Sequence, residues 1–81
     1  MDLLKGNNFV IAGKLEQFNS HKDLKLKIES LGGRVSASIT NQTSVLISND
    51  KNPLSKKNKM AQELSIPIMT EEEFVQTINY S

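Results

Sequence analysis

Four lysines gathered in one short stretch of the chain are the first candidates for binding chemistry. They are Lys51, Lys56, Lys57 and Lys59. Clustered lysines can follow a phosphate backbone because each contact releases counterions from the nucleic acid. No aromatic side chain lies among them, which argues against stacking on single-stranded bases. The stretch predicts a weak, salt-sensitive contact with double-stranded DNA, and a solvated helix surface is the alternative interpretation.

The residue types that most often perform catalysis or bind metal do not form a set in this sequence. Cysteine is absent, and the one histidine, His21, has no Ser, Cys or acidic partner that its position identifies. A metal site needs several ligands, so we expect no metal site and no catalytic residue. Residues 12–14 (AGK) follow an apolar run, but the earlier glycine and the final Ser or Thr of a phosphate loop are missing. We therefore expect a non-catalytic chain with no cofactor of its own.

Length and composition favour a small binding module over a complete enzyme. The chain has 81 residues, whereas domains usually contain about 100–150 residues, so there is room for one core. Ten basic and nine acidic residues give a net charge of +1, so the distribution of charge must identify a charged partner. No apolar run approaches the roughly 20 residues that cross a bilayer, and we expect no membrane partner. We expect residues 1–81 to form one domain that is a fragment of a longer protein.

The apolar pattern predicts strands and helices in the order β-α-β-β-α-β-α. The strands are expected at residues 9–12 (FVIA), 34–39 (RVSASI), 45–47 (VLI) and 66–69 (IPIM). The helices are expected at residues 20–31, 52–64 and 70–78. Pro67 cannot donate to a ladder, so the last strand belongs at a sheet edge. Helices between strands imply an α/β fold with a small parallel sheet covered on both faces.

The predicted helices begin at recognisable capping residues. Ser20 begins the first helix and Thr70 the last, each with an acidic residue three positions later. Asn52, which precedes a proline, is the first choice for the start of the second helix, and Ser55 is the alternative. The acids at residues 71–73 (EEE) are most simply explained as compensation of the last helix's dipole.

Two glycines mark the joint between the first helix and the second strand, within residues 28–35 (IESLGGRV). Gly32 can adopt the left-handed backbone that closes a helix. Gly33 lets the next strand leave without a clash at Cβ. This joint fixes where a helical pattern becomes a strand.

Five motifs in register resemble the BRCT domain in order and spacing. They are residues 9–13 (FVIAG), 31–35 (LGGRV), 43–47 (TSVLI), 61–68 (AQELSIPI) and 73–74 (EF). The resemblance covers nearly the whole chain. It implies a four-stranded parallel sheet of strand order 2-1-3-4, with two helices on one face and one on the other.

Two subgroups of the family are similar to this chain, and both belong to DNA-repair enzymes. Residues 13–15 (GKL) and 58–60 (NKM) resemble the BRCT domain of poly(ADP-ribose) polymerases, whereas residues 61–68 also resemble NAD-dependent DNA ligases. The polymerase is preferred. It implies a nuclear interaction module of the DNA damage response, in the automodification region of an NAD-dependent ADP-ribosyltransferase. Such a module would contact repair proteins through exposed side chains such as Leu26, and exposed acids would be candidate ADP-ribosylation sites. The alternative is a weak DNA-contacting module of a ligase or a related repair factor.

The resemblance also implies a phosphate pocket, which this chain only partly retains. Many BRCT domains bind phosphoserine through a hydroxyl at the end of the first strand, the N–H of the next glycine, and a lysine on the second helix. Gly13 and Lys57 match that pattern, but Ala12 supplies no hydroxyl. A phosphate needs several donors that converge on its oxygens. We therefore expect a pocket remnant and do not expect a phosphopeptide to be the partner.

Overall fold

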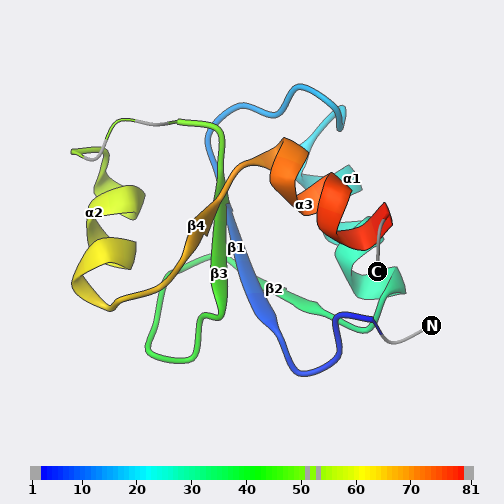
Figure 1. Ribbon diagram of the computed structural model, residues 1–81, viewed down its shortest axis with the longest axis horizontal. Coiled ribbons are helices and arrows are strands. Elements are labelled where there is room, and N and C mark those ends of the chain that lie inside the picture. Colours follow the sequence, from blue (N-terminus) through cyan, green and yellow to red (C-terminus); the bar gives the residue numbers. More distant parts are fainter. Residues whose placement is uncertain (1–2, 51, 53, 80–81) are drawn as a thin grey trace.

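A parallel sheet with helices on both faces organises residues 3–50, 52 and 54–79, which the computed structural model describes (Figure 1). The strands are β1 (Asn8–Ala12), β2 (Arg34–Ser36), β3 (Val45–Ser48) and β4 (Ile68–Met69). The helices are α1 (His21–Ser30), α2 (Lys56–Glu63) and α3 (Glu71–Asn79). The four strands of these described residues lie in the order β2-β1-β3-β4, and all of their pairings are parallel. The predicted element order and strand order are confirmed.

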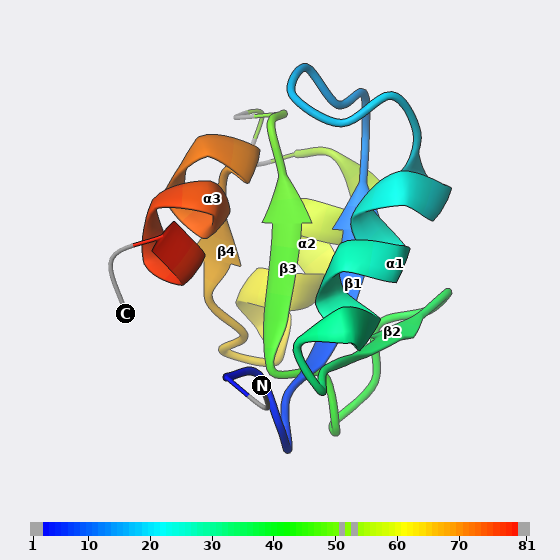
Figure 2. The same cartoon turned by 90° about the vertical axis from the view of Figure 1, so that its right-hand side faces the viewer.

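Strand β1 lies at the centre of the sheet because its side chains are apolar on both faces. Phe9 and Ile11 face the core under α1 and α3, where Phe9 packs edge-to-face on Phe74 with ring centroids 5.7 Å apart. Val10 faces the opposite core, which Ala61 of α2 covers. Figures 1 and 2 show α1 and α3 together on one side of the sheet and α2 alone on the other. The expected division of the helices is confirmed.

The glycine joint has the backbone that the sequence predicts. Gly32 has φ of +88°, and its N–H donates to Glu29 O at 3.0 Å. The N–H of Gly33 donates to Ile28 O at 3.0 Å, and Gly33 is buried. A Cβ atom at Gly33 would lie 2.7 Å from Ile28 Cγ2 and 3.1 Å from Leu4 Cβ. The strand therefore passes closer to the helix than any larger residue would allow.

The second strand is shorter than the alternation predicts. It ends at Ser36 rather than at residue 39, and its pairing with β1 ends with Val10 opposite Ser36. The chain then leaves the sheet, and Ile39 is buried in the core that α2 covers. The alternating apolar pattern therefore extends beyond the strand, because Ile39 is buried under α2 and not in the strand ladder. A side chain can be buried without belonging to a strand.

Helix α2 begins at the second of the two starts predicted for it, and the first choice, Asn52, is wrong. Ser55, the alternative, is the N-cap residue of α2, while the Oδ1 of Asn52 accepts from Leu54 N at 3.0 Å in the turn before it. Lys51 and Pro53 lie outside the described residues.

Helices α1 and α3 begin at the predicted capping residues. The Oγ of Ser20 accepts from Asp23 N at 3.2 Å. Thr70 and Glu73 exchange side-chain-to-backbone hydrogen bonds, each of 3.1 Å.

Among the described residues, no helix combines the length and the apolar character that a membrane span requires.

Candidate functional site

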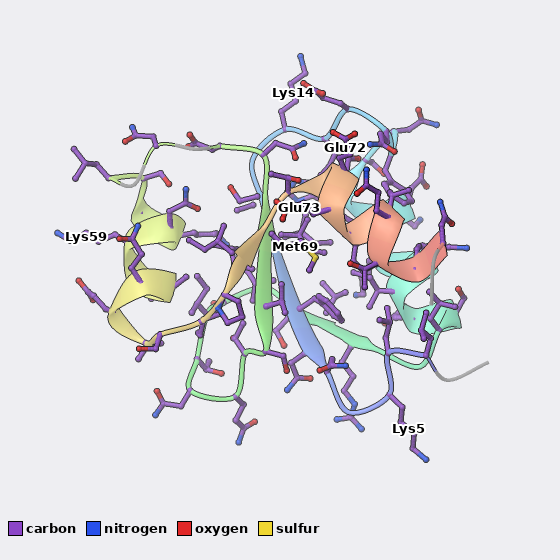
Figure 3. All side chains as sticks on the ribbon, in the orientation of Figure 1. Lys5, Lys14, Lys59, Met69, Glu72 and Glu73 are labelled. Carbon is purple, nitrogen blue, oxygen red and sulfur yellow. The ribbon has the colours of Figure 1, made fainter. Side chains whose placement is uncertain are left out.

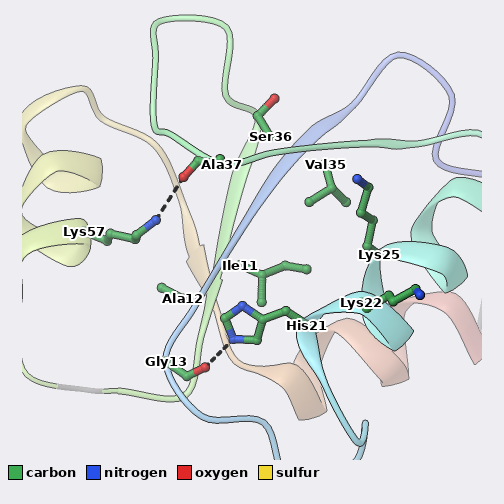
Figure 4. Close-up of a pocket in the computed structure, with 10 residues that line it drawn as sticks. All are labelled: Ile11, Ala12, Gly13, His21, Lys22, Lys25, Val35, Ser36, Ala37 and Lys57. Atoms are coloured by element: carbon green, nitrogen blue, oxygen red, sulfur yellow. Dashed lines mark hydrogen bonds between the residues drawn. The ribbon is translucent and has the colours of Figure 1, made fainter.

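A groove of about 600 Å³ opens at the carboxyl ends of β1 and β2, between α1 and α2 (Figure 4). Apolar side chains such as Ile11 and Val35 lie along it. Its polar side chains come mainly from the two helices: His21, Lys22 and Lys25 from α1, and Lys57 from α2. Among the residues that the structure describes, no acidic one lines it. We call this cavity the α1–β2 groove.

The predicted lysine cluster does not form one surface. Lys57 extends along the α1–β2 groove, where its Nζ donates to Ala37 O at 3.1 Å (Figure 4). Lys56 lines the two smaller cavities next to this groove. Lys59 is exposed and points away from the sheet (Figure 3), and Lys51 lies outside the described residues. Helical geometry separates Lys57 from Lys56 and Lys59, because each residue of a helix is rotated by about 100° from the one before it.

His21 is hydrogen-bonded to the end of the first strand. Its Nε2 lies 2.6 Å from Gly13 O (Figure 4). A carbonyl oxygen can only accept, so Nε2 carries the hydrogen. Gly13 has φ of +76°, and this bond holds its carbonyl toward α1. Among the described residues, no group of three or more His, Cys, Asp or Glu side chains is placed to hold a metal ion.

The residues of the predicted phosphate-pocket remnant do come together. Ala12, Gly13 and Lys57 line both the α1–β2 groove and a neighbouring cavity of about 240 Å³. Ser48 pairs with Ala12 across the sheet, but its Oγ accepts from Asp50 N at 3.2 Å within its own turn. Asp50 also lines the smaller cavity. The Oγ of Ser48 is thus already hydrogen-bonded, and the carboxylate of Asp50 beside it opposes an anion.

Glu71 has a structural role that the sequence analysis did not predict. Its side chain is 1% exposed and accepts from three successive backbone N–H groups, those of residues 16, 17 and 18, at 2.7–2.9 Å. The Nδ2 of Asn49 donates to it at 3.0 Å, and the Oδ1 of Asn49 accepts from Glu71 N at 2.9 Å. Compensation of the helix dipole therefore does not fully explain Glu71. Glu72 and Glu73 are exposed, and for them this explanation remains sufficient.

These contacts also set the ionisation of Glu71. Burial is the largest influence and raises the pKa of the carboxyl. The hydrogen bonds from the N–H of Glu16, the amide of Asn49 and the N–H groups of Phe18 and Gln17 together outweigh it and hold the pKa below its ordinary value. The ionised carboxylate ties the loop between β1 and α1 to the start of α3. No sequence motif signals this, because the two partners are more than fifty residues apart.

Lys22 and Lys25 were also missed as candidate site residues. They lie on the polar face of α1, three residues apart, which by itself indicates only a solvated surface. Their position beside Lys57 arises because α1 packs next to β2, and the sequence pattern does not show which strand end a helix borders.

Comparison with known proteins shows which protein family this chain resembles. A family model described as the BRCA1 C Terminus (BRCT) domain matches residues 1–78. A DNA ligase of Lachnoclostridium phytofermentans is 50% identical over 76 residues, which are 94% of this chain and 12% of that protein. A DNA ligase of Ruminiclostridium cellulolyticum is 47% identical over 72 residues, which are 89% of this chain and 11% of that protein. The chain thus spans a small part of these curated relatives.

One solved structure with a similar fold is the crystal structure of Rad4 BRCT1,2 in complex with a Crb2 phosphopeptide. The match covers 96% of the present chain and 41% of that chain, with a TM-score of 0.81 and a sequence identity of 17%. At that identity the match concerns the fold alone.

The sequence relatives favour the ligase subgroup, so the preference for a poly(ADP-ribose) polymerase and an ADP-ribosyltransferase parent is not supported. The named relatives are bacterial proteins, so a nuclear location is not supported either.

Proposed function

We propose, from the finding that this chain belongs to the BRCT family, that it is the DNA-contacting module of a bacterial NAD-dependent DNA ligase. The module catalyses no reaction itself. Because the match covers only a small part of each relative, we assign the joining reaction and its NAD cofactor to the rest of the parent enzyme. The chain would then act in the bacterial cytoplasm, beside the chromosome.

The observation that carries the DNA-binding part of the proposal is the α1–β2 groove, which has three lysines and no acid among its lining residues. The whole chain has a net charge of only +1, so this local excess of positive charge is what would attract a phosphate backbone. Lysine contacts to phosphate position a protein on DNA without reading its sequence. Such a module would hold a duplex near the catalytic part of a ligase and raise its effective concentration there.

Neither protein contact nor phosphopeptide binding has comparable support. Leu26 is 54% exposed, but single exposed apolar side chains are common on protein surfaces. Ala12 offers no hydroxyl to a phosphoserine, and Asp50 lies next to the matching glycine and lysine. Contacts with repair proteins remain an expectation that no observation in the structure strengthens.

Reversing two charges beside the groove tests the proposal. We expect the Lys56→Glu/Lys57→Glu variant of the 81-residue chain to bind a labelled DNA duplex at least about tenfold more weakly at low salt, because a lysine of the groove and its neighbour become repulsive to phosphate. Fluorescence anisotropy measures the affinity. A Lys5→Glu/Lys27→Glu variant has the same net charge, and both of its exposed positions lie outside the α1–β2 groove. An equal loss in the two variants, or no duplex binding by the unmodified chain, would contradict a DNA-contacting role.

The same titration separates DNA from a phosphopeptide. With a phosphoserine peptide and its unphosphorylated counterpart as ligands, we expect equal and weak binding of both. Selective binding of the phosphorylated peptide that disappears in Lys57→Ala would replace this proposal with phosphopeptide recognition.

A further inference from the structure

We infer that α1 supplies the main DNA contacts, so that phosphates of one strand lie in the α1–β2 groove between Lys22 and Lys25 on one side and Lys57 on the other. This inference rests on the proposed function and specifies its binding surface. It differs from the sequence prediction, which placed the contact on the lysines at residues 51–59. It keeps Lys57 of the predicted remnant but moves the site away from Gly13 and toward the first two turns of α1.

The distribution of acids around the groove favours the α1 side. Asp50 lies next to Gly13, with its Cβ 4.0 Å from the position that a Cβ at Gly13 would occupy. Its Oδ1 accepts from Asn52 N at 2.9 Å, which keeps the carboxylate in that loop. A phosphate placed in the smaller cavity beside Gly13 would meet this negative charge, whereas none of the residues that line the α1–β2 groove is acidic.

The spacing of the lysines on α1 suits a polynucleotide strand. Residues three apart on a helix are separated by a rise of about 4.5 Å and lie on one face. Phosphates of one DNA strand follow each other every 3.4 Å or so along the helix axis. Lys22 and Lys25 are both exposed, and their flexible side chains can therefore contact neighbouring phosphates. Figure 4 shows them on α1, across the groove from Lys57.

Lys57 is held in a position that completes this arrangement. Its hydrogen bond to Ala37 O uses one of the three ammonium donors, which leaves two for a phosphate. The bond also restrains the side chain along the groove, which reduces the conformational entropy lost on binding. The lining residues include no Phe, Tyr or Trp side chain, and the ring of His21 is hydrogen-bonded to Gly13 O, so the groove suits a backbone better than stacked bases. The ligand is therefore the sugar-phosphate backbone, bound without sequence preference.

The salt dependence of duplex binding measures the number of phosphate contacts. Each phosphate contact contributes about −0.9 to the slope of log affinity against log salt concentration. For three contacts, we expect the affinity of the unmodified 81-residue chain to fall about 40-fold between about 50 and about 200 mM salt. For Lys22→Gln/Lys25→Gln, which leaves one contact, we expect a fall of only about 3.5-fold over the same range.

The control variant Lys5→Gln/Lys59→Gln removes the same charge at two exposed positions that do not line the α1–β2 groove. It should keep the steep salt dependence of the unmodified chain. If Lys22→Gln/Lys25→Gln also keeps it while Lys56→Glu/Lys57→Glu weakens binding, the inference fails and the proposed function stands. If the unmodified chain binds no duplex even at low salt, the proposed function itself fails. Circular dichroism checks that each variant remains folded.

Discussion

Glu71→Ala is expected to lower the free energy of unfolding by about 4 kcal/mol, because four partly buried hydrogen bonds lose their acceptor together. The donors are the N–H groups of residues 16–18 and the side-chain amide of Asn49. Each such loss costs about 1–3 kcal/mol when water cannot replace the acceptor. Glu16 and Gln17 are exposed, so water recovers part of the loss in this loop. Urea denaturation followed by circular dichroism measures the change.

A matched pair of amide substitutions separates the buried carboxylate from helix-dipole effects. Glu72→Gln removes one negative charge from the same helical turn, but Glu72 is exposed, so we expect a cost below about 1 kcal/mol. Glu71→Gln keeps the shape of the side chain and should cost about 2 kcal/mol, because it removes the charge and one acceptor oxygen. Equal costs for the two variants would show that Glu71 acts only through the dipole.

The effect of Glu71 should also depend on pH in a defined direction. Its pKa is lowered in the folded chain, so the carboxylate stabilises the fold above the pKa of the unfolded chain, which for Glu is about 4.3. That contribution is lost as the pH falls through the folded-state pKa. The stability difference between the unmodified chain and Glu71→Gln should therefore be constant near neutral pH and shrink in acid. A difference that grows in acid would contradict the lowered pKa.

Gly33→Ala is expected to lower the free energy of unfolding by about 3 kcal/mol through overpacking. The new Cβ would meet Ile28 Cγ2 at 2.7 Å, Leu4 Cβ at 3.1 Å and the Ile28 carbonyl oxygen at 3.3 Å. Ile28 has no exposed surface and lies in the core, so it cannot move aside without disturbing its neighbours. Thermal or urea denaturation measures the loss.

Two further variants distinguish a steric clash from a general intolerance of glycine replacement. Gly6 has φ of +86° but no atom within 4 Å of an added Cβ, so Gly6→Ala should cost about 1 kcal/mol from backbone strain alone. In an Ile28→Ala background, Gly33→Ala should cost less than in the unmodified chain because the nearest contact is gone. An unchanged cost in that background would assign the effect to the backbone.

The contacts of Glu71 also bear on the proposed DNA surface. Residues 16–18, which Glu71 holds, lie in the loop that leads from β1 into α1. Helix α1 carries Lys22 and Lys25 to the groove, and His21 ties its first turn back to Gly13. The loop that precedes α1 is thus hydrogen-bonded to a buried anion at the start of a different helix.

Local patterns were sufficient to predict most of the fold. The apolar runs of β1 and β3, the capping pair at Thr70 and Glu73, and the left-handed Gly32 were all readable, because each depends on neighbours within a few residues. The predicted end of β2 was wrong because burial of Ile39 under α2 imitates the alternation of a strand. Burial alone does not specify which face of the sheet a residue occupies.

The candidate site was predicted less completely than the fold. Lys57 was named and does line the groove, and Ala12 and Gly13 lie beside it. Lys59 was grouped with Lys57 only because the two are close in sequence. Lys22 and Lys25 were not predicted as site residues, because the pattern of one helix carries no information about what lies opposite it.

The sequence by itself determined the family, the order of the elements and the absence of a hydroxyl at Ala12, since these follow from residue identity and short-range spacing. Only the tertiary structure decided which charges share a surface. It placed lysines of α1 and α2 on one groove and buried Glu71 beneath the loop at residues 16–18. The physical reason is that electrostatic and hydrogen-bonding partners are set by distance in space. Those distances arise when helices from distant parts of the chain pack on a common sheet.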